Sequence, residues 1–286
     1  MAAGALTTTE AANYLPTLWS LEVIDEYYAN FVLLNLVDQS YKELAKAGYG
    51  NKVRVPICSA PAGFTTITEG SAVTQYTQAV ESYKDIDVTT YQGLRLSWPS
   101  IVDIQTQPSL RQNYTRMMGI EAAKAIDATL AALVDNFSQT VGTLATDLGD
   151  DEILRAEQYL DDANAPLEDR FLVLSPAALM NLYKVEKYAN SLYRQTSGNL
   201  DGSKGKGYIG KLYRSDVYES SAIEGSNAAG HDNGMWQRKA IAAIVQQEPK
   251  VEQWRNVASA MDEVIVWALW GSVEMRDTSG VWVKGP

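Results

Sequence analysis

The longest periodic stretch of this sequence is SLRQNYTRMMGIEAAKAIDATLAALVDNF, residues 109–137. Its apolar side chains recur every three or four residues, a spacing that brings them onto one face of an α-helix. These side chains are Leu110, Tyr114, Met118, Ala122, Ile126, Leu130, Leu133 and Phe137. The stretch therefore predicts a helix about 40 Å long that packs an apolar stripe against an equally long surface.

The ends and the opposite face of this helix carry signals of their own. Ser109 followed by Gln112 matches a capping box, and Pro108 disfavours helix before it. We therefore expect the helix to start at its serine cap. The opposite face carries the charged residues Arg111, Arg116, Lys124, Asp127 and Asp135, which are expected to be solvated.

The chain begins with a segment that predicts an arm. Residues 1–16 are small and polar, as is typical of a loose terminus. Residues 19–36 predict an amphipathic segment, and residues 31–37, FVLLNLV, are apolar on nearly all sides. Such a segment needs a host, which could be the core of its own chain or a neighbouring subunit.

Strand-like alternation follows in residues 52–98. Residues 53–57 alternate between apolar and other side chains, as do residues 85–89 and 94–98. Between them, residues 59–78 offer few apolar anchors. We interpret the whole region as a two-stranded excursion with a weakly supported tip. Because an isolated hairpin is marginal in water, the tip is expected to lie on another subunit.

The remaining segments alternate short helices and strands. Asp150 or Asp151 is predicted to cap a helix that ends near Asp162, and Ser175 followed by Pro176 starts another. Predicted strands are residues 171–174, 208–213, 216–220, 239–246, 251–257, 264–275 and 280–283, and predicted loops are residues 197–207 and 224–234. This succession predicts a compact α+β fold.

Composition narrows the possible functions. The single cysteine, Cys58, excludes an intramolecular disulfide, and the single histidine, His231, leaves almost no basis for zinc sites or His-based triads within one chain. We interpret Cys58 as a small strand residue and His231 as an exposed loop residue. A net charge of −11 without a visible basic patch argues against a general nucleic-acid-binding protein.

Two further features bear on location and partners. The sequence shows neither a secretory signal nor an apolar run of about 18 residues. It therefore predicts a soluble protein without a membrane partner that stays in the cytoplasm where it is made. The 16 Tyr and 7 Trp against 4 Phe favour surfaces that are buried against a partner.

No catalytic, cofactor-binding or metal-binding constellation stands out. Residues 202–207, GSKGKG, lack the spacing of a phosphate loop and the Ser or Thr that should follow its lysine. Asp85 and Asp87 share one face of a strand, which leaves open a carboxylate-dependent enzyme. Nothing nearby completes such a site, so a solvated strand face is the preferred interpretation, and the chain is expected to need no cofactor.

Four groups of segments together carry a family resemblance. They are FVLLNLVDQSY (31–41) with GNKVRVP (50–56), IVDI (101–104) running into the long helix, RFLVLSP (170–176) with GYIGKLY (207–213) and VYES (217–220), and VEQWR (251–255) with DEVIV (262–266) and LWGSV (269–273). Their order and spacing over residues 15–283 resemble major capsid proteins of tailed bacteriophages with the Hong Kong 97-type (Johnson) fold, closest to podophage-type coat proteins. The chain has no room for the inserted domain of some of these proteins.

The resemblance implies a role for each part of the chain. Residues 1–50 would be an N-terminal arm, and residues 51–99 an extended β-hairpin loop that lies on the adjacent subunit. Residues 100–149 would hold the spine helix of a peripheral domain. Residues 150–245 would form an axial domain, and residues 246–286 would return strands to the peripheral domain.

The resemblance also implies a function that is structural and not enzymatic. The chain would assemble through hexamers and pentamers into an icosahedral shell around double-stranded DNA. It would be assembled in the host bacterial cytoplasm and end in the virion. Expected partners are further copies, scaffolding, portal and cement or decoration proteins, and non-specifically packaged DNA. An alternative with the same fold is a nanocompartment shell.

In such a shell, two features of the long helix gain an interpretation. Its apolar stripe would rest on a sheet built from residues 100–107 and the C-terminal strands. Arg111, Arg116 and Lys124 would be candidates for contact with a neighbouring subunit or the genome.

Overall fold

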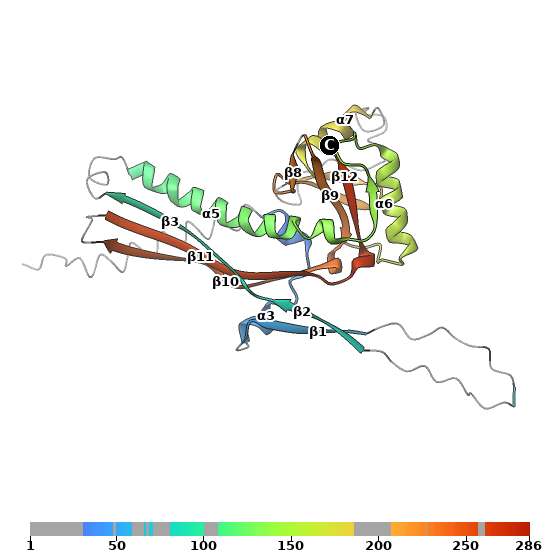
Figure 1. The fold of residues 1–286 in the computed structure, drawn as a ribbon, viewed down its shortest axis with the longest axis horizontal. Coiled ribbons are helices and arrows are strands. Elements are labelled where there is room, and N and C mark those ends of the chain that lie inside the picture. The colour runs from blue at the N-terminus through green and yellow to red at the C-terminus, as the bar shows by residue number, and fades with distance from the viewer. Residues whose placement is uncertain are drawn as a thin grey trace, which may run out of the picture.

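The computed structural model describes residues 31–47, 50–58, 66, 69–70, 81–99, 108–185, 207–226, 228–256 and 261–286. Figure 1 shows a long helix lying along a narrow sheet, a compact body at one end of them, and a separate hairpin. The predictions for residues 1–30, for most of the hairpin tip, for residues 101–107 and for the loop up to residue 206 lie outside the described residues.

The long helix α5 spans Pro108–Ala131 and is shorter than predicted. After it, the chain tightens into the 3-10 turn η2, Val134–Asn136, so the prediction of continuous helix to Phe137 is wrong. Phe137 is instead extended and packs on Gly280, where an added Cβ would lie 2.2 Å from the phenyl ring. The helix also starts at the proline, so Ser109 lies inside the first turn and is not the N-cap.

Strands β10 (Ile241–Asn256), β11 (Met261–Glu274) and β3 (Thr90–Pro99) form an antiparallel sheet beneath this helix, in the order β10–β11–β3. The prediction that residues 90–98 belong to the two-stranded excursion is therefore wrong, and β3 occupies the place expected for residues 100–107.

The predicted strands 239–246 and 251–257 form one strand. Register shifts between Val245 and Lys250 absorb Pro249, which has no N–H to donate.

The apolar stripe of α5 packs on two different partners. Met118 contacts a cluster with Val264 and Val266 on the narrow sheet, whereas Ile126 and Leu130 enter the main core of the compact body. Burial of these side chains confirms the predicted stripe, although Tyr114 near the far end is exposed. The helix therefore joins the narrow sheet to the compact body.

The compact body is a seven-stranded mixed sheet in the order β4–β12–β9–β5–β7–β6, with β8 paired to β9. Its strands are β4 (Thr140–Gly142), β5 (Arg170–Leu174), β6 (Tyr208–Leu212), β7 (Ser215–Glu219), β8 (Gly225–Ser226), β9 (Gly230–Gln237) and β12 (Gly280–Gly285). Phe171 and Val173 face the end of α5, and Leu172 and Leu174 face the opposite core. The uniform apolarity of β5 arises because both of its faces are covered.

Helices α6 (Asp150–Asp162) and α7 (Pro176–Lys184) contribute to the second core. Ser175 accepts a hydrogen bond from the backbone N–H of Ala178 at 3.2 Å, which confirms the predicted cap of α7. The predicted cap of α6 is wrong by one or two residues. Gly149 is the N-cap, and its N–H donates to the Glu152 carboxylate at 3.0 Å.

Residues 230–237 form β9 and residues 225–226 form β8, so the prediction of a loop over residues 224–234 is wrong for most of its length. The glycine and polar residues of β9 do not alternate as strand residues usually do. This segment is nevertheless a strand, because it pairs with β5 on one side and β12 on the other. His231 therefore lies in a strand and is half-buried, and its Nδ1 contacts the carbonyl oxygen of Pro286. Cys58 ends a strand as predicted.

The hairpin consists of β1 (Lys52–Cys58) and β2 (Glu81–Asp87), paired antiparallel. Its root is built into the subunit, because Val55 and Ile86 are buried in a cluster with Ala242 and Ile244 of β10. The end of β2 also passes close to β11, where a Cβ on Gly271 would lie 2.2 Å from the carbonyl oxygen of Asp87. The predicted excursion is thus confirmed as a hairpin for its first two strands.

Replacing Gly271 with alanine is expected to displace the hairpin root and to lower the free energy of unfolding by about 1–3 kcal/mol. The added methyl group would meet the backbone of Asp87 and Val88, which cannot rotate away. Urea denaturation measures the loss. The matched control is Ser272→Ala, the next residue of the strand, for which we expect little change. Equal stability of the two variants would show that the close approach is not restrictive.

Candidate assembly surfaces

The arm root, residues 31–38, docks on its own subunit. Phe31, Leu33, Leu34, Leu36 and Val37 are buried in the main core. Its middle forms a short 3-10 turn, η1 (Leu33–Leu36). The apolar segment that the sequence left without a defined host therefore packs against its own chain.

The side chain of Asp127 on α5 binds the start of the arm root through hydrogen bonds. Its carboxylate accepts hydrogen bonds from the backbone N–H groups of Val32 at 2.9 Å and Leu34 at 3.2 Å. The residue is only 3% exposed, so its prediction as a solvated charge is wrong. The sequence did contain an indication that Asp127 is buried. Ala123 and Ala131 lie four residues before and after it, so the three residues share one face of the helix with small side chains.

Burial changes the titration of this carboxyl group. Desolvation raises the pKa of Asp127 to about 6, against the opposing effect of the backbone N–H groups of residues 32–34. By contrast, the other charged residues of the predicted polar face that the structure describes, Arg116, Lys124 and Asp135, are exposed. Lys124 forms an ion pair with Glu121 at 2.7 Å.

The exposed face of the hairpin carries a ladder of ion pairs. Arg54 donates from Nε to Asp85 at 2.8 Å, and Lys52 lies 3.2 Å from Asp87 and 3.3 Å from Asp85. The guanidinium of Arg54 also lies over the ring of Tyr83 at 4.0 Å. The two carboxylates share a face as predicted, and the hydrogen bond from Arg54 lowers the pKa of Asp85. A carboxylate held ionised in this way is a poor general acid.

The face of the narrow sheet that points away from α5 exposes aromatic side chains. Trp254 on β10 is 70% exposed and Tyr91 on β3 is 63% exposed. The ring of Tyr91 lies 5.5 Å from that of Trp267, and Arg95 pairs with Glu263 at 2.6 Å. Aromatic centres among paired charges are typical of surfaces that bind another protein.

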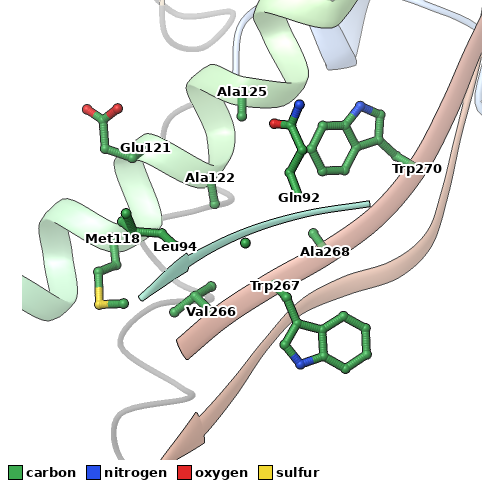
Figure 2. Close-up of a pocket in the computed structure, with 11 residues that line it drawn as sticks. Gln92, Leu94, Met118, Glu121, Ala122, Ala125, Val266, Trp267, Ala268 and Trp270 are labelled. Carbon is green, nitrogen blue, oxygen red and sulfur yellow. The ribbon is translucent and has the colours of Figure 1, made fainter. Parts of the chain in front are cut away.

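A second apolar feature is a groove of about 220 Å³ between α5 and β3. Figure 2 shows Met118 and Leu94 at one end of it and Gln92 beside Trp270 at the other. On the helix side, the small side chains of Ala122 and Ala125 leave room for the groove. Its lining can accept an apolar side chain but offers no chemistry for catalysis.

A buried ion cluster fixes the end of α6. The fully buried guanidinium of Arg170 lies 2.7 Å from Asp161 and 4.0 Å from Glu157, and Arg214 lies 3.0 Å from Asp161. Arg170 lowers the pKa of Asp161, whereas burial raises the pKa of Glu157. No local pattern predicts this cluster, because its two arginines come from β5 and from the turn between β6 and β7, whereas both carboxylates come from α6.

Nothing among the described residues resembles an active site. That part of the chain holds no group of three or more His, Cys, Asp or Glu side chains placed to bind a metal ion. Among its helices, none is long and apolar enough to cross a membrane. The glycine-rich segment of residues 202–206 lies outside the described part of the chain.

Comparison with known proteins shows the family of this chain. The family model of the phage capsid protein matches residues 81–282, which is more than half of the chain. The chain belongs to the phage capsid protein family. No curated protein sequence matches this capsid protein. Membership confirms the resemblance to tailed-phage major capsid proteins and the expected structural role, and it favours neither the nanocompartment nor the enzyme alternative.

Solved structures show the same fold. A chain of Mycobacterium phage Che8 matches with a TM-score of 0.73 at 22% identity, covering 88% of this capsid protein and 90% of that chain. The capsid of cyanophage P-SCSP1u matches with a TM-score of 0.63 at 14% identity, covering 83% and 84%. Microbacterium phage Oxtober96 gives 0.63 at 12% identity, covering 91% and 90%. The fold is thus the predicted α+β capsid fold of the Hong Kong 97 type.

Proposed function

We propose that this capsid protein assembles through hexamers and pentamers into an icosahedral shell that encloses double-stranded DNA. The observation that carries the proposal is the β1–β2 hairpin, a two-stranded sheet that lies apart from the narrow sheet and the compact body (Figure 1). A two-stranded hairpin of this kind is marginal alone in water, so a neighbouring subunit is the natural support for it.

The parts of the chain have the following proposed roles. Residues 1–50 form an arm whose root is anchored on its own subunit. The extended loop expected at residues 51–99 reaches the next subunit through the β1–β2 hairpin, whereas β3 stays in the narrow sheet. Residues 100–149 and 246–286 form the peripheral domain, with α5 as its spine. Residues 150–245 form the axial domain, which meets its copies at the capsomer centre. The separate narrow sheet and compact body support two such domains, although β3 pairs within the narrow sheet and β4 and β12 pair within the compact body.

The net negative charge of the protein indicates how it would contact packaged DNA. Because the net charge is −11, the genome's charge is balanced mainly by counter-ions, and any DNA contact is non-specific. Arg116 and Lys124 are exposed cations on α5 that could approach the genome or a neighbour. Scaffolding, portal and decoration proteins are the expected further partners, and assembly takes place in the host cytoplasm before the shell becomes part of the virion.

Particle size tests the proposal. The purified chain, concentrated with and without a crowding agent, is expected to form closed shells of uniform diameter in negative-stain microscopy and a fast boundary in sedimentation. A single species near 31.4 kDa under every assembly condition, including co-expression with the scaffolding protein of its own virus, would contradict it. Shells filled with a specific protein cargo would instead support a nanocompartment.

A further inference from the structure

The arm root is attached at two points that differ in chemistry. At its far end, Asp38 forms backbone hydrogen bonds with β10, donating to Ile241 and accepting from Ala243, both at 3.0 Å. At its near end, the backbone N–H groups of Val32 and Leu34 depend on the Asp127 carboxylate. The far attachment is made by backbone groups, which do not ionise, whereas the near attachment is made by the ionisable carboxyl group of Asp127.

Among the described residues, no cation forms an ion pair with Asp127. The ionisable groups that line the small pocket beside it are Lys124, one turn earlier on α5, and Glu219 at the end of β7. Lys124 is exposed and already paired with Glu121. The arm root itself contributes Asp38 alone, at its opposite end. Within the described part of the chain, the groups that stabilise an ionised carboxylate here are the backbone N–H groups of residues 32–34, and they do not fully offset the cost of its desolvation.

The pocket offers a route for water. It has a volume of about 280 Å³ and lies between Val32 of the arm root, α5, and the turn that contains Ser220 and Ser221. Undocking of the arm root would open this space to solvent and hydrate the carboxylate. Ionised Asp127 therefore has a more favourable environment when the arm root is released than when it is docked.

We propose that the arm root is a releasable latch, held most firmly when Asp127 is protonated and loosened when Asp127 ionises. The latch couples the ionisation of one side chain on the spine helix to the position of the N-terminal arm. Its effect on shell assembly rests on the proposed function, but the latch itself is a property of the single subunit and is tested there.

The direction of the pH dependence follows from the two pKa values. Docked Asp127 has a pKa of about 6, and a hydrated aspartate has a pKa near 3.9. The docked state binds more protons between these values, so docking is strongest below about pH 4 and weakens as pH rises to about 6. A difference of about two pKa units corresponds to about a hundredfold change in the opening equilibrium.

Amide hydrogen exchange of the unassembled full chain tests the latch. After correction for intrinsic exchange rates, opening of residues 32–36 is expected to be about 25-fold more frequent at pH 7.5 than at pH 4.5. Asp127→Asn is expected to remove this dependence while keeping an oxygen acceptor. Asp135→Asn changes an exposed aspartate shortly after α5 and is expected to leave the dependence intact.

Two results would overturn the proposal. One is wild-type protection of residues 32–36 that does not change with pH, a measurement that needs no variant. The other is a folded Asp127→Asn protein with the same pH dependence as the wild type. Neither depends on whether shells form, so failure of the latch and failure of the proposed assembly can be told apart.

Discussion

Deleting residues 62–78 is expected to give folded subunits that form no shells. The deletion removes the far part of the hairpin and spares the buried residues of its root, Val55, Ile86 and Val88, together with both main cores. Folding therefore loses little, whereas the proposed contact with the next subunit is lost entirely. Thermal unfolding followed by circular dichroism measures the first effect, and negative-stain microscopy measures the second.

The matched control replaces residues 62–78 with a Gly/Ser segment of equal length. This variant keeps the spacing of the hairpin ends but removes the side chains of the tip, and it is also expected to form no shells. If only the deletion fails to assemble, chain length rather than side-chain contact is what the shell requires. Normal shells from the deletion would refute the role of the hairpin between subunits.

Arg170→Ala is expected to lower the free energy of unfolding by about 3–5 kcal/mol. The Arg170 side chain has 0% exposure and donates to the carbonyl oxygens of Ala165 at 2.8 Å and Pro166 at 2.9 Å, besides its ion pair with Asp161. Its removal would leave these carbonyl oxygens without their donor and Glu157 buried beside one cation fewer. Urea denaturation at pH 7 measures the difference.

The control is Arg214→Ala, because Arg214 contacts the same two carboxylates from a side chain that is 54% exposed. We expect a loss of about 1 kcal/mol or less, as is usual for solvent-screened pairs. Similar losses in both variants would show that burial of Arg170 is not what makes it important. The comparison separates the cost of an unpaired buried charge from that of one ion pair.

Local sequence patterns determined much of this protein. The apolar spacing of α5, the Ser175–Pro176 start of α7 and the alternation in β1 and β2 each depend on neighbours within a few residues, so they could be recognised without coordinates. The order of such segments was also sufficient to suggest the capsid family. Solvated faces such as that of Asp85 and Asp87 follow the same local rule.

The tertiary structure alone decided which segments meet. Residues 90–99 alternate as a hairpin strand would, and only pairing with β11 placed them beneath α5. Gly230–Gln237 lacks a strand pattern, and neighbours on both sides make it one. Asp127 resembles a surface charge until the arm root, more than 90 residues earlier, covers it. In each case the deciding contact joins residues that are far apart in the sequence. The periodicity of side chains within one segment depends only on that segment and therefore cannot predict such a contact.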